Sequence, residues 1–445
     1  MHSKVARNMS DRFQAKVKKE ESRYLEELEQ VKEAMDNSSA RYRGQPIDFL
    51  HYPLFVSWAE VEELERILHD LTKVLRKAVR HYLEEPDFRK FFGFPPQMEE
   101  LIIQDPGYSL PFPIGRFDIF RPEEGPIQFC ELNTDGSSGM NEARALQETI
   151  GDTGLLRETK GDHNLFSFDP FQEWIEAILD NYAEFLGREP DDPTIAIVDF
   201  EGEGIESEFR EFKRKFRAAG YQTFICDPRW LNYDGGRLTY EGQEIDLVYR
   251  RATTARIVDR MEEVGDFLSA YRDGAVCVVG GFRSQIVHDK VIFAVLGDED
   301  KSGFLTEEER EFVSNHIPET RVLKEEDRKL LARVKKEKDL YLLKPRDRFA
   351  GHGICIGRDC NADRWEELVE EKGEEDDYLV QRFCDVPTKR MPYVEEGEIH
   401  WDPFNYLMGL YIYNESLAGM YTRVGRENLI GSIVECFTVP NFVVD

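Results

Sequence analysis

The chain has 445 residues, of which 41% are hydrophobic, 12% aromatic and 33% charged. This length and aromatic content exclude a disordered chain and predict two or three packed subdomains with sizeable cores. Its 58 Lys and Arg against 88 Asp and Glu give a net charge of −30, which opposes binding to nucleic acid and to anionic membranes.

The start of the chain, MHSKVARNMSDRFQAKVKKEE, has no apolar signal core, and nowhere do about eighteen apolar residues follow one another. The seven cysteines are an odd number, are widely spaced and contain no C-x-x-C pair. These features predict a cytoplasmic protein with reduced thiols that has neither nucleic acid nor membrane as a partner. They leave the oligomeric state open.

Residues 1–105 are predicted to form a helical N-terminal region. Apolar residues recur every three to four positions between Phe13 and Met35, which is the spacing of one helix face. A longer helix is expected over 57–85, and Ser57 with Glu60 forms a capping-box pattern at its start. These helices are expected to supply core and surface and no chemistry.

Residues 106–190 begin with short strand-like runs broken by proline and glycine, and GRFDIF and PIQFCELN are predicted to pair as a hairpin. The turn near Glu123 and Glu124 brings Asp118 opposite Glu131. Because side chains alternate along a strand, each strand places one set of residues on a shared face. The sets are Arg116, Asp118 and Phe120 in the first strand, and Phe129, Glu131 and Asn133 in the second.

Two carboxylates that face each other repel, so Asp118 and Glu131 are expected to hold a cation or an arginine between them. Aspartate, glutamate and asparagine supply the hard oxygen ligands that Mg²⁺ prefers. The loop TDGSSG that follows leaves backbone groups open beside this position. The alternative is a surface hairpin with solvated acids.

Residues 191–275 alternate strand and helix: TIAIVDF, an amphipathic helix that stops at Gly220, YQTFICDP and IDLVYRR. This pattern predicts a small α/β subdomain. In the segment 276–445 we expect a helix at DKVIFAVL, a charged helical stretch over 304–340, and the strands YLLKP, GICIG and YLVQRF.

A second candidate site lies in YLLKPRDRFAGHGICIG, where a strand delivers Lys344 and the next loop carries Gly351 and Gly353. Glycines let backbone amides approach a phosphate closely, and the lysine supplies a point charge. The segment is neither a Walker loop nor a Rossmann fingerprint. An ordinary glycine hairpin is the alternative.

A third candidate, DEDKSGFLTEEE from Asp298 to Glu309, matches the calcium-binding loop in length, glycine and terminal glutamate. Such loops usually occur in pairs, and the sequence has no second one. The same residues also predict a helix that is capped by Thr306, with Glu309 as its capping-box partner. H-E-x-x-H and G-x-S-x-G are absent, and the nine histidines have no evident nucleophile partner.

Taken in order, these segments resemble the circularly permuted ATP-grasp ligases of the glutathionylspermidine synthase type. The resemblance spans residues 110–440 and is carried by GRFDIF, FCELNTDG, VVGGFRSQIVHDKVIFAVL, EEREFVSNHIPETRVL, LLKPRDRFAGHGI, YLVQRF and AGMYTRVG. It implies an α/β, glutathione synthetase-like ATP-grasp fold whose metal-binding acids precede its nucleotide-binding lysines. Residues 106–190 would supply the metal-binding hairpin and part of the core, 191–275 the substrate side, and 276–445 the nucleotide side with a lid at 325–385.

The resemblance also implies a role for each candidate residue. Mg²⁺ would be held by Asp118, Glu131 and Asn133, and the ATP phosphates by Lys290 and Lys344 under a loop from Arg348 to Gly353 that includes Gly351. Adenine would lie against the segment 380–383, which contains Gln381, Arg382 and Phe383. Arg116 and Arg423 would stabilise the transferring phosphoryl group and the tetrahedral intermediate.

The implied reaction converts a small-molecule or peptide carboxylate to an acyl phosphate, which an amine then attacks, with release of ADP and phosphate. Lysines, arginines and a metal suffice for it, without a dedicated nucleophile. The N-terminal amidase module of some relatives is missing, and Glu319 stands where relatives often have an aromatic residue. The alternatives are a small-molecule kinase on the same fold and a non-catalytic nucleotide- or calcium-binding module.

Overall fold

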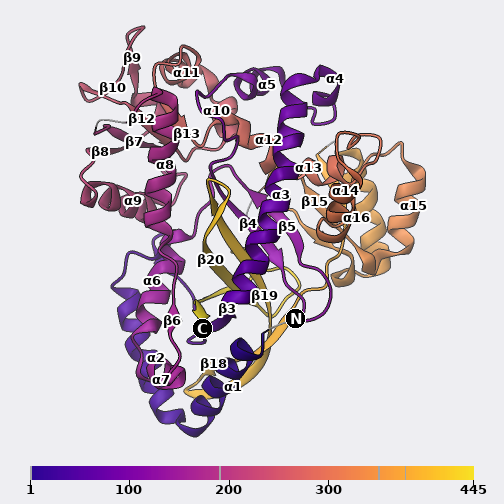
Figure 1. The fold of residues 1–445 in the computed structure, drawn as a ribbon. Coiled ribbons are helices and arrows are strands. Elements are labelled where there is room, and N and C mark those ends of the chain that lie inside the picture. The colour runs from indigo at the N-terminus through magenta and orange to yellow at the C-terminus, as the bar shows by residue number, and fades with distance from the viewer. Residues whose placement is uncertain (1–2, 190–191, 349–350, 376) are drawn as a thin grey trace.

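A computed structural model of the chain describes residues 3–189, 192–348, 351–375 and 377–445. A large antiparallel sheet lies at the centre of the molecule (Figure 1). In this view an α/β unit lies to one side of the central sheet, and a smaller unit of strands and helices lies to the other. The central sheet therefore connects two peripheral units.

The central sheet has the strand order β21-β20-β19-β4-β5, and β18 pairs with β19. Its strands are β4 (Ile114–Phe120), β5 (Gln128–Asn133), β18 (Thr388–Glu395), β19 (Glu398–Tyr413), β20 (Ser416–Gly425) and β21 (Phe437–Val439). The predicted hairpin β4–β5 is confirmed, and β19 pairs with its inner side. The hairpin is therefore part of a larger buried sheet and not the solvated surface hairpin that was the alternative.

The register of the hairpin places Asp118 opposite Glu131, as expected. A bulge follows, because Cys130 is an extra residue between Glu131 and Phe129, which pairs with Ile119. Phe129 consequently packs in the core beside Phe117. The prediction that Phe129 shares a face with Glu131 is wrong, since the bulge shifts the alternation by one residue.

The N-terminal region contains α1 (Lys4–Lys19), α2 (Glu21–Asp36), α3 (Trp58–Glu84), α4 (Pro86–Arg89) and α5 (Pro96–Ile103). The capping box of Ser57 and Glu60 at the start of α3 is confirmed. Buried residues of α3, such as Leu68 and Leu75, belong to the same core cluster as Phe117 of β4. Helix α3 thus covers one face of the central sheet and leaves the other face to the polar residues of the hairpin.

Two short sheets lie outside the central sheet, and one of them holds the C-terminal strand. The strand β22 (Asn441–Val444) lies between β3 (Leu54–Ser57) and β6 (Leu165–Phe166). The strands β1 (Arg41–Tyr42) and β2 (Gln45–Pro46) form a small separate hairpin after α2. Helices α6 (Met140–Gly151) and α7 (Gly154–Lys160) follow the loop after β5.

The strands and the amphipathic helix predicted between residues 194 and 251 are present and belong to an α/β unit. Its four parallel strands have the order β13-β12-β7-β8. They are β7 (Ile195–Val198), β8 (Thr223–Cys226), β12 (Leu247–Arg250) and β13 (Cys277–Val279), with helices α8 (Pro170–Leu186), α9 (Glu206–Ala218), α10 (Thr254–Asp259) and α11 (Gly265–Arg272). The short strands β9 (Asn232–Tyr233), β10 (Leu238–Tyr240) and β11 (Gln243–Glu244) form an appended sheet. Because the chain runs outward from β7 in both directions, the sheet order reverses between β7 and β12.

The smaller unit, which we call the lid unit, spans β14 to β17 and has the strand order β14-β17-β15-β16. Its strands are β14 (Thr320–Val322), β15 (Tyr341–Pro345), β16 (Cys355–Ile356) and β17 (Tyr378–Arg382), with helices α15 (Arg328–Lys336) and α16 (Ala362–Glu374). It has its own core around Trp365 and Leu343. Helices α12 (Gln285–His288), α13 (Val291–Leu296) and α14 (Glu307–His316) precede it.

The three strands expected in the last third of the chain are present, but the helical expectation for 304–340 is wrong in its middle. Helix α14 ends at His316, and β14 follows and pairs with β17. The reason is Pro318, since the residue before a proline disfavours helical backbone. The β-branched residues Thr320 and Val322 then suit a strand.

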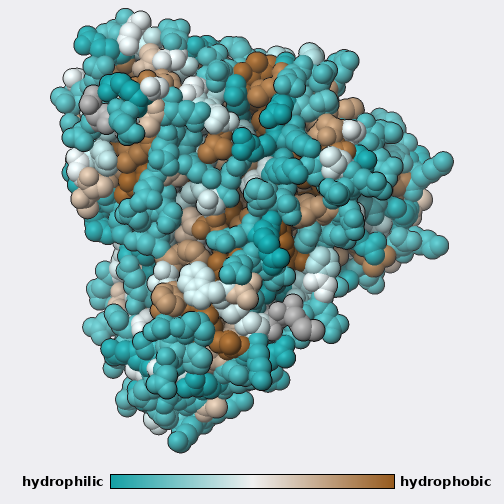
Figure 2. Space-filling view, in the orientation of Figure 1, coloured by the Kyte–Doolittle hydropathy of each residue, from teal (hydrophilic) through white to brown (hydrophobic). Residues whose placement is uncertain are grey.

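The surface seen in Figure 2 is mostly hydrophilic, with smaller hydrophobic patches between the charged side chains. Among the described residues, no helix combines the length and the apolar character that a membrane crossing requires. All seven cysteines are free thiols.

The capping box of α3 yields a stability prediction. The Ser57 side chain accepts from the backbone N–H of Glu60 at 3.3 Å, and Glu60 accepts from the N–H of Ser57 at 2.8 Å. Ser57→Ala should lower the free energy of unfolding by about 1 kcal/mol, because it leaves a helix-terminal N–H without a partner. Urea unfolding followed by circular dichroism measures this loss, with Ser314→Ala on exposed α14 as control. An unchanged midpoint for Ser57→Ala would contradict the prediction.

Candidate active site

A cavity of about 2050 Å³ joins the three parts of the molecule. The lid unit contributes Leu342, Lys344 and Gln381, the central sheet Arg116, Glu131 and Arg423, and the α/β unit Asp199, Phe209 and Arg251. Predicted residues that lie far apart in the chain therefore surround one space. A ligand in this cavity would contact the lid unit at one end and the α/β unit at the other.

Asp118 is fully buried beneath the cavity and binds two arginines. Its Oδ1 accepts from Nε of Arg116 at 2.7 Å, and its Oδ2 accepts from Nη2 of Arg423 at 2.8 Å. Nδ2 of Asn133 donates to the same Oδ2 at 3.3 Å. Each acid thus has its own cations. Both arginines contact Asp118, and Glu131 contacts Lys290, instead of the single cation between the two acids that we expected.

A glycine on the intervening strand β19 leaves space for the contact between Asp118 and Arg116. Gly409 pairs with Asp118 on one side and with Tyr421 on the other. A Cβ at this position would lie 2.8 Å from Cδ of Arg116 and 2.9 Å from Oδ1 of Asp118. Any other residue would push these side chains apart, so Gly409 is required for the geometry of the pair.

Lys290 and Lys344 lie next to Glu131. Nζ of Lys290, between α12 and α13, lies 2.9 Å from Oε1 of Glu131, and it also donates to the carbonyl of Arg348 at 2.8 Å. Nζ of Lys344 on β15 donates to the carbonyl of Cys130 at 3.0 Å. Burial alone would raise the pKa of Glu131, but the charges of Lys290 and Lys344 outweigh it and hold the pKa at about 2.

We call these side chains, Arg116, Asp118, Glu131, Asn133, Lys290, Lys344 and Arg423, the charged cluster. The cluster contains four cations and two carboxylates, which leaves two positive charges in excess. This excess occurs in a chain whose net charge is −30. A partly buried positive wall in such a protein attracts an anion with several charges, and phosphate groups meet that requirement.

The other residues predicted to bind the nucleotide differ in whether they line the cavity. Gly351, Gln381 and Phe383 line the cavity, and Gly351 has a φ of +84° that favours glycine. Gly353 packs close to Tyr378, whose Oη would lie 2.9 Å from a Cβ at this position. Residues 349 and 350 of the predicted phosphate loop lie outside the described residues.

Arg382 differs from its neighbours because its side chain is exposed. Its backbone N–H donates to the carbonyl of Glu319, and the N–H of Phe383 donates to that of Leu340. These two N–H groups are therefore used inside the lid unit. Recognition of a base at this end would depend on the carbonyls and on the side chains of Gln381 and Phe383.

Several cavity residues escaped the sequence analysis. Asp199 directly follows β7, and Arg251 directly follows β12, where the order of the parallel sheet reverses. Burial raises the pKa of Asp199 to about 6. Both strands were predicted from the sequence. Because ligands of parallel sheets bind beyond the carboxyl ends of the strands where the strand order reverses, the residues after these strands could have been named as candidates.

A buried acidic pair, Glu142 and Glu208, lies beside this part of the site, and Glu142 lines the cavity. Oη of Tyr421 donates to Glu142 at 2.6 Å, and burial raises the pKa of Glu142. Oε1 of Glu208 on α9 accepts from the backbone N–H groups of Gly139 and Met140, each at 3.0 Å. No spacing in the sequence connects these residues, because they meet only through packing of α6 and α9 near the central sheet.

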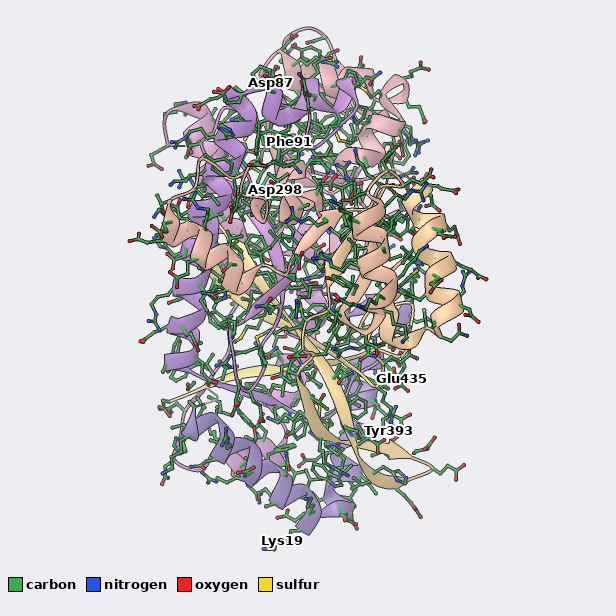
Figure 3. The ribbon with its side chains drawn as sticks, turned by 90° about the vertical axis from the view of Figure 1, so that its right-hand side faces the viewer. Lys19, Asp87, Phe91, Asp298, Tyr393 and Glu435 are labelled. Atoms are coloured by element: carbon green, nitrogen blue, oxygen red, sulfur yellow. The ribbon has the colours of Figure 1, made fainter. Side chains whose placement is uncertain are left out.

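The capping-box alternative for the segment Asp298 to Glu309 is confirmed. Glu309 accepts from the N–H of Thr306 as its capping-box partner and forms ion pairs with Lys73 and Lys77. Asp298 pairs with Lys301 and Arg321. The first and last acids of the calcium-loop pattern therefore contact cations of the chain, and Asp298 lies far from cavity residue Glu435 (Figure 3).

In the described part of the chain, a metal ion would have to be bound by oxygen atoms from a small number of residues. Within the described ranges, no three His, Cys, Asp or Glu residues come together as a metal-binding group. Asp118, Glu131 and Asn133 nevertheless share one face of the hairpin, with Asp118 paired to Glu131. The oxygen type suits Mg²⁺, which is usually bound by one or two carboxylates together with phosphate oxygens. Both oxygens of Asp118 accept from arginines and Glu131 contacts Lys290, so a metal would replace some of these contacts when it binds.

No protein-family model matches the sequence, and no curated protein matches it. Among solved structures, a glutathione synthetase-like effector from Globodera pallida, in its apo form, aligns with a TM-score of 0.61 at 10% identity, over 94% of this chain and 97% of that chain. A provisional gamma-glutamylcysteine synthetase from Methylobacillus flagellatus KT gives a TM-score of 0.41 at 12% identity, over 84% of this chain and 88% of that chain. The first likeness shows that the chain has a glutathione synthetase-like α/β fold, and at this identity it concerns the fold alone.

The pair of Lys290 and Glu131 yields a pH-dependent prediction. Lys290→Met should lower the free energy of unfolding by about 2 kcal/mol at pH 7, because it removes a cation from a largely buried carboxylate. The loss should shrink at pH 4. There the wild-type Glu131, with its pKa of about 2, stays ionised while the unfolded chain takes up a proton. In the variant Glu131 takes up that proton in the folded state too.

Urea unfolding at both pH values measures this difference. Lys335→Met provides the control, since Lys335 pairs with Glu370 on the surface of the lid unit. A loss for Lys290→Met that is equal or larger at pH 4 would contradict the assignment of the low pKa to Lys290.

Proposed function

We propose that the chain is an ATP- and Mg²⁺-dependent carboxylate–amine ligase that forms an amide through an acyl phosphate. The observation that carries this proposal is the charged cluster. Arg116, Glu131, Asn133, Lys344 and Arg423 line the cavity, and Asp118 and Lys290 are buried behind them. The cluster has excess positive charge for phosphates, hard oxygens for a metal, and open space on both sides. No single motif in the sequence carries the proposal by itself.

The lid-unit end of the cavity is proposed to hold ATP. Lys290 and Lys344 are nine-tenths or more buried, and their Nζ atoms are fixed by Glu131 and by backbone carbonyls. Fixed cations stabilise developing phosphoryl charge without reorganising during the reaction. The apolar and polar side chains of Leu342, Gln381 and Phe383 line the same end and would bind the base.

Asp118, Glu131 and Asn133 are proposed to hold the metal. When bound, Mg²⁺ would neutralise phosphate charge and align the phosphoryl group. Glu131 on β5 faces Lys290, and its carboxylate is ionised at any pH above its pKa of about 2.

The two arginines have different free donors. Arg116 donates to Asp118 with Nε and Nη2 and to the carbonyl of Ser138 with Nη1. Arg423 donates to Asp118 with Nη2, and its Nε has no partner among the described residues. Arg423 therefore keeps donors for the transferring phosphoryl group and the tetrahedral oxyanion, whereas Arg116 would act with its remaining charge and by holding Asp118.

The chain order supports the circularly permuted, glutathionylspermidine synthase-like arrangement within the ATP-grasp class. The acids of the hairpin at 114–133 precede Lys290 and Lys344. The lid unit has its own core and could move as one body, so its closure would exclude water from an acyl phosphate. The α/β end of the cavity would bind the other substrate.

The direct test is ADP formation from Mg²⁺ and ATP with a panel of acid and amine pairs. For an active pair, Lys344→Met should reduce turnover about a hundredfold, since it removes one fixed charge on the transferring group. Lys335→Met, on the surface of the same unit, should behave as the wild type. Circular dichroism confirms that each variant is folded.

Full turnover by folded Lys344→Met would contradict the role of this lysine. Formation of a stable phosphorylated acid without an amide would instead identify the chain as a kinase, and no ADP formation with any pair would contradict an ATP-dependent reaction.

A further inference from the structure

The small hairpin β1–β2 from the N-terminal region lines the same cavity as the charged cluster. Residues 41–48 all belong to the cavity wall, together with the start of α9 and the loop between β20 and β21. None of the residues of the charged cluster belongs to this hairpin. The hairpin thus adds a further part of the chain to the site, from a region whose role the sequence left open.

Two contacts fix the hairpin at this place. Oγ of Ser207 on α9 donates to the carbonyl of Arg41 at 2.9 Å. The hydroxyls of Tyr42 and Ser432 lie 3.1 Å apart, which ties the hairpin to the loop between β20 and β21. The hairpin therefore spans two walls of the cavity at the end formed by the α/β unit.

The hairpin carries two arginines without an acidic partner. Neither Arg41 nor Arg43 forms an ion pair with any carboxylate in the part of the chain that the structure describes, and Arg41 donates only to the carbonyls of Asp36 and Gly44. Arg43 lies over the ring of Tyr42, with its guanidinium carbon 5.3 Å from the ring centroid. Both side chains therefore keep N–H donors and charge for a ligand.

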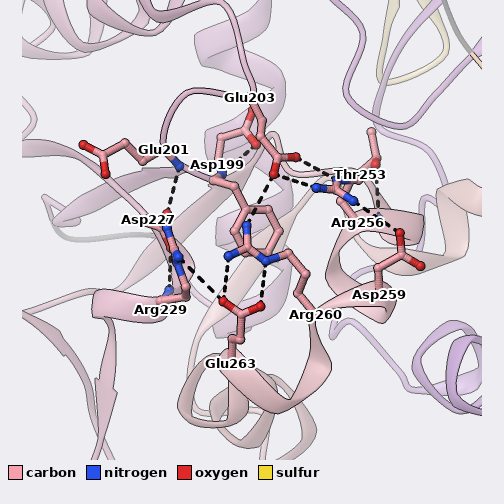
Figure 4. A network of polar contacts seen from close by, with 11 residues as sticks. Asp199, Glu201, Glu203, Asp227, Arg229, Thr253, Arg256, Asp259, Arg260 and Glu263 are labelled. Atoms are coloured by element: carbon pink, nitrogen blue, oxygen red, sulfur yellow. Dashed lines mark hydrogen bonds and ion pairs between the residues drawn. The ribbon is translucent and has the colours of Figure 1, made fainter.

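Other arginines on the same rim are paired. Arg210 contacts Glu206 at 2.6 Å and Arg214 contacts Glu211 at 2.5 Å. Arg256 and Arg260 both contact Glu203 (Figure 4). Arg41 and Arg43 therefore differ from these paired arginines in having no carboxylate partner among the described residues.

The turn holds Arg43 at the tip of the hairpin. Arg43 and Gly44 are the two residues between the paired strands, with φ values of +49° and +80°. Such a two-residue turn favours asparagine or glycine at both positions. Glu241 with Gly242 and Glu396 with Gly397 have similar φ values in two other hairpins, so the turn itself does not distinguish Arg43.

We infer that Arg41 and Arg43 form an anion-binding subsite that recognises a carboxylate of the substrate at the α/β end of the cavity. This inference rests on the proposed function for the identity of the cavity as a substrate site. The recognised carboxylate is one that does not react, since the phosphoryl-transfer groups belong to the charged cluster. The hairpin thereby selects substrates that carry a second negative charge.

The test compares two probes by calorimetry in the absence of nucleotide. They are N-acetyl-glutamylglycine, with two carboxylates, and N-acetyl-glutaminylglycine, with one. The wild type should bind the first about tenfold more tightly, the effect of one charge-assisted contact. The double variant Arg41→Gln, Arg43→Asn should lose this preference and bind the second probe as the wild type does. Asparagine keeps the turn, because it favours positive φ.

Arg210→Ala should keep the preference, since Arg210 is already paired with Glu206. Equal binding of the two probes by the wild type, or a preference that survives in the double variant, would overturn the inference. Because no nucleotide is present, the result is independent of ADP formation. A preference without any ATP-dependent turnover would contradict the proposed function and leave the anion-binding subsite in place.

Discussion

The contact on which the rest of the site depends is the one between Asp118 and its two arginines. Arg116 and Arg423 carry like charges and would repel each other without the buried carboxylate between them. A charge left alone in such a place is strongly destabilising, so the acid and both arginines are ordered together. Gly409 leaves the room for this meeting on the strand between them. The contact thus joins β4 to β20 across β19, next to Glu131 on the neighbouring strand β5.

The second constraint is the distribution of charge. The chain is strongly acidic, yet the charged cluster carries an excess of positive charge, and Arg41 and Arg43 have no acidic partner among the described residues. Elsewhere on the cavity rim, arginines are neutralised by glutamates. A cleft with positively charged walls raises the local concentration of anions. The two unneutralised regions therefore define two places for negative groups of a ligand, near the lid unit and near the α/β unit.

The sequence predicted those parts of the site that depend on local alternation. The pairing of Asp118 with Glu131 follows from the alternation of side chains along the strands and from the position of the turn. Phe129 was assigned to the wrong face because of the bulge at Cys130, which no residue type in the sequence indicates. The strands before Asp199 and Arg251 were predicted, but their adjacency depends on sheet order, which is a long-range property. Glu142 and the hairpin β1–β2 reach the cavity only through packing, and Glu208 reaches the start of α6 in the same way, so none of them had a signal in the spacing of the sequence. The capping boxes at Ser57 and Thr306 were predicted because they are local.

The central claim is that the charged cluster binds nucleotide phosphates. Calorimetric titration of ADP in the presence of Mg²⁺ tests it most directly, because it needs neither the acid nor the amine. The account predicts one-to-one binding by the wild type that weakens as salt is added and is lost when Lys290 and Lys344 are both replaced by methionine. No binding by the wild type, or unchanged binding by the folded double variant, would contradict it.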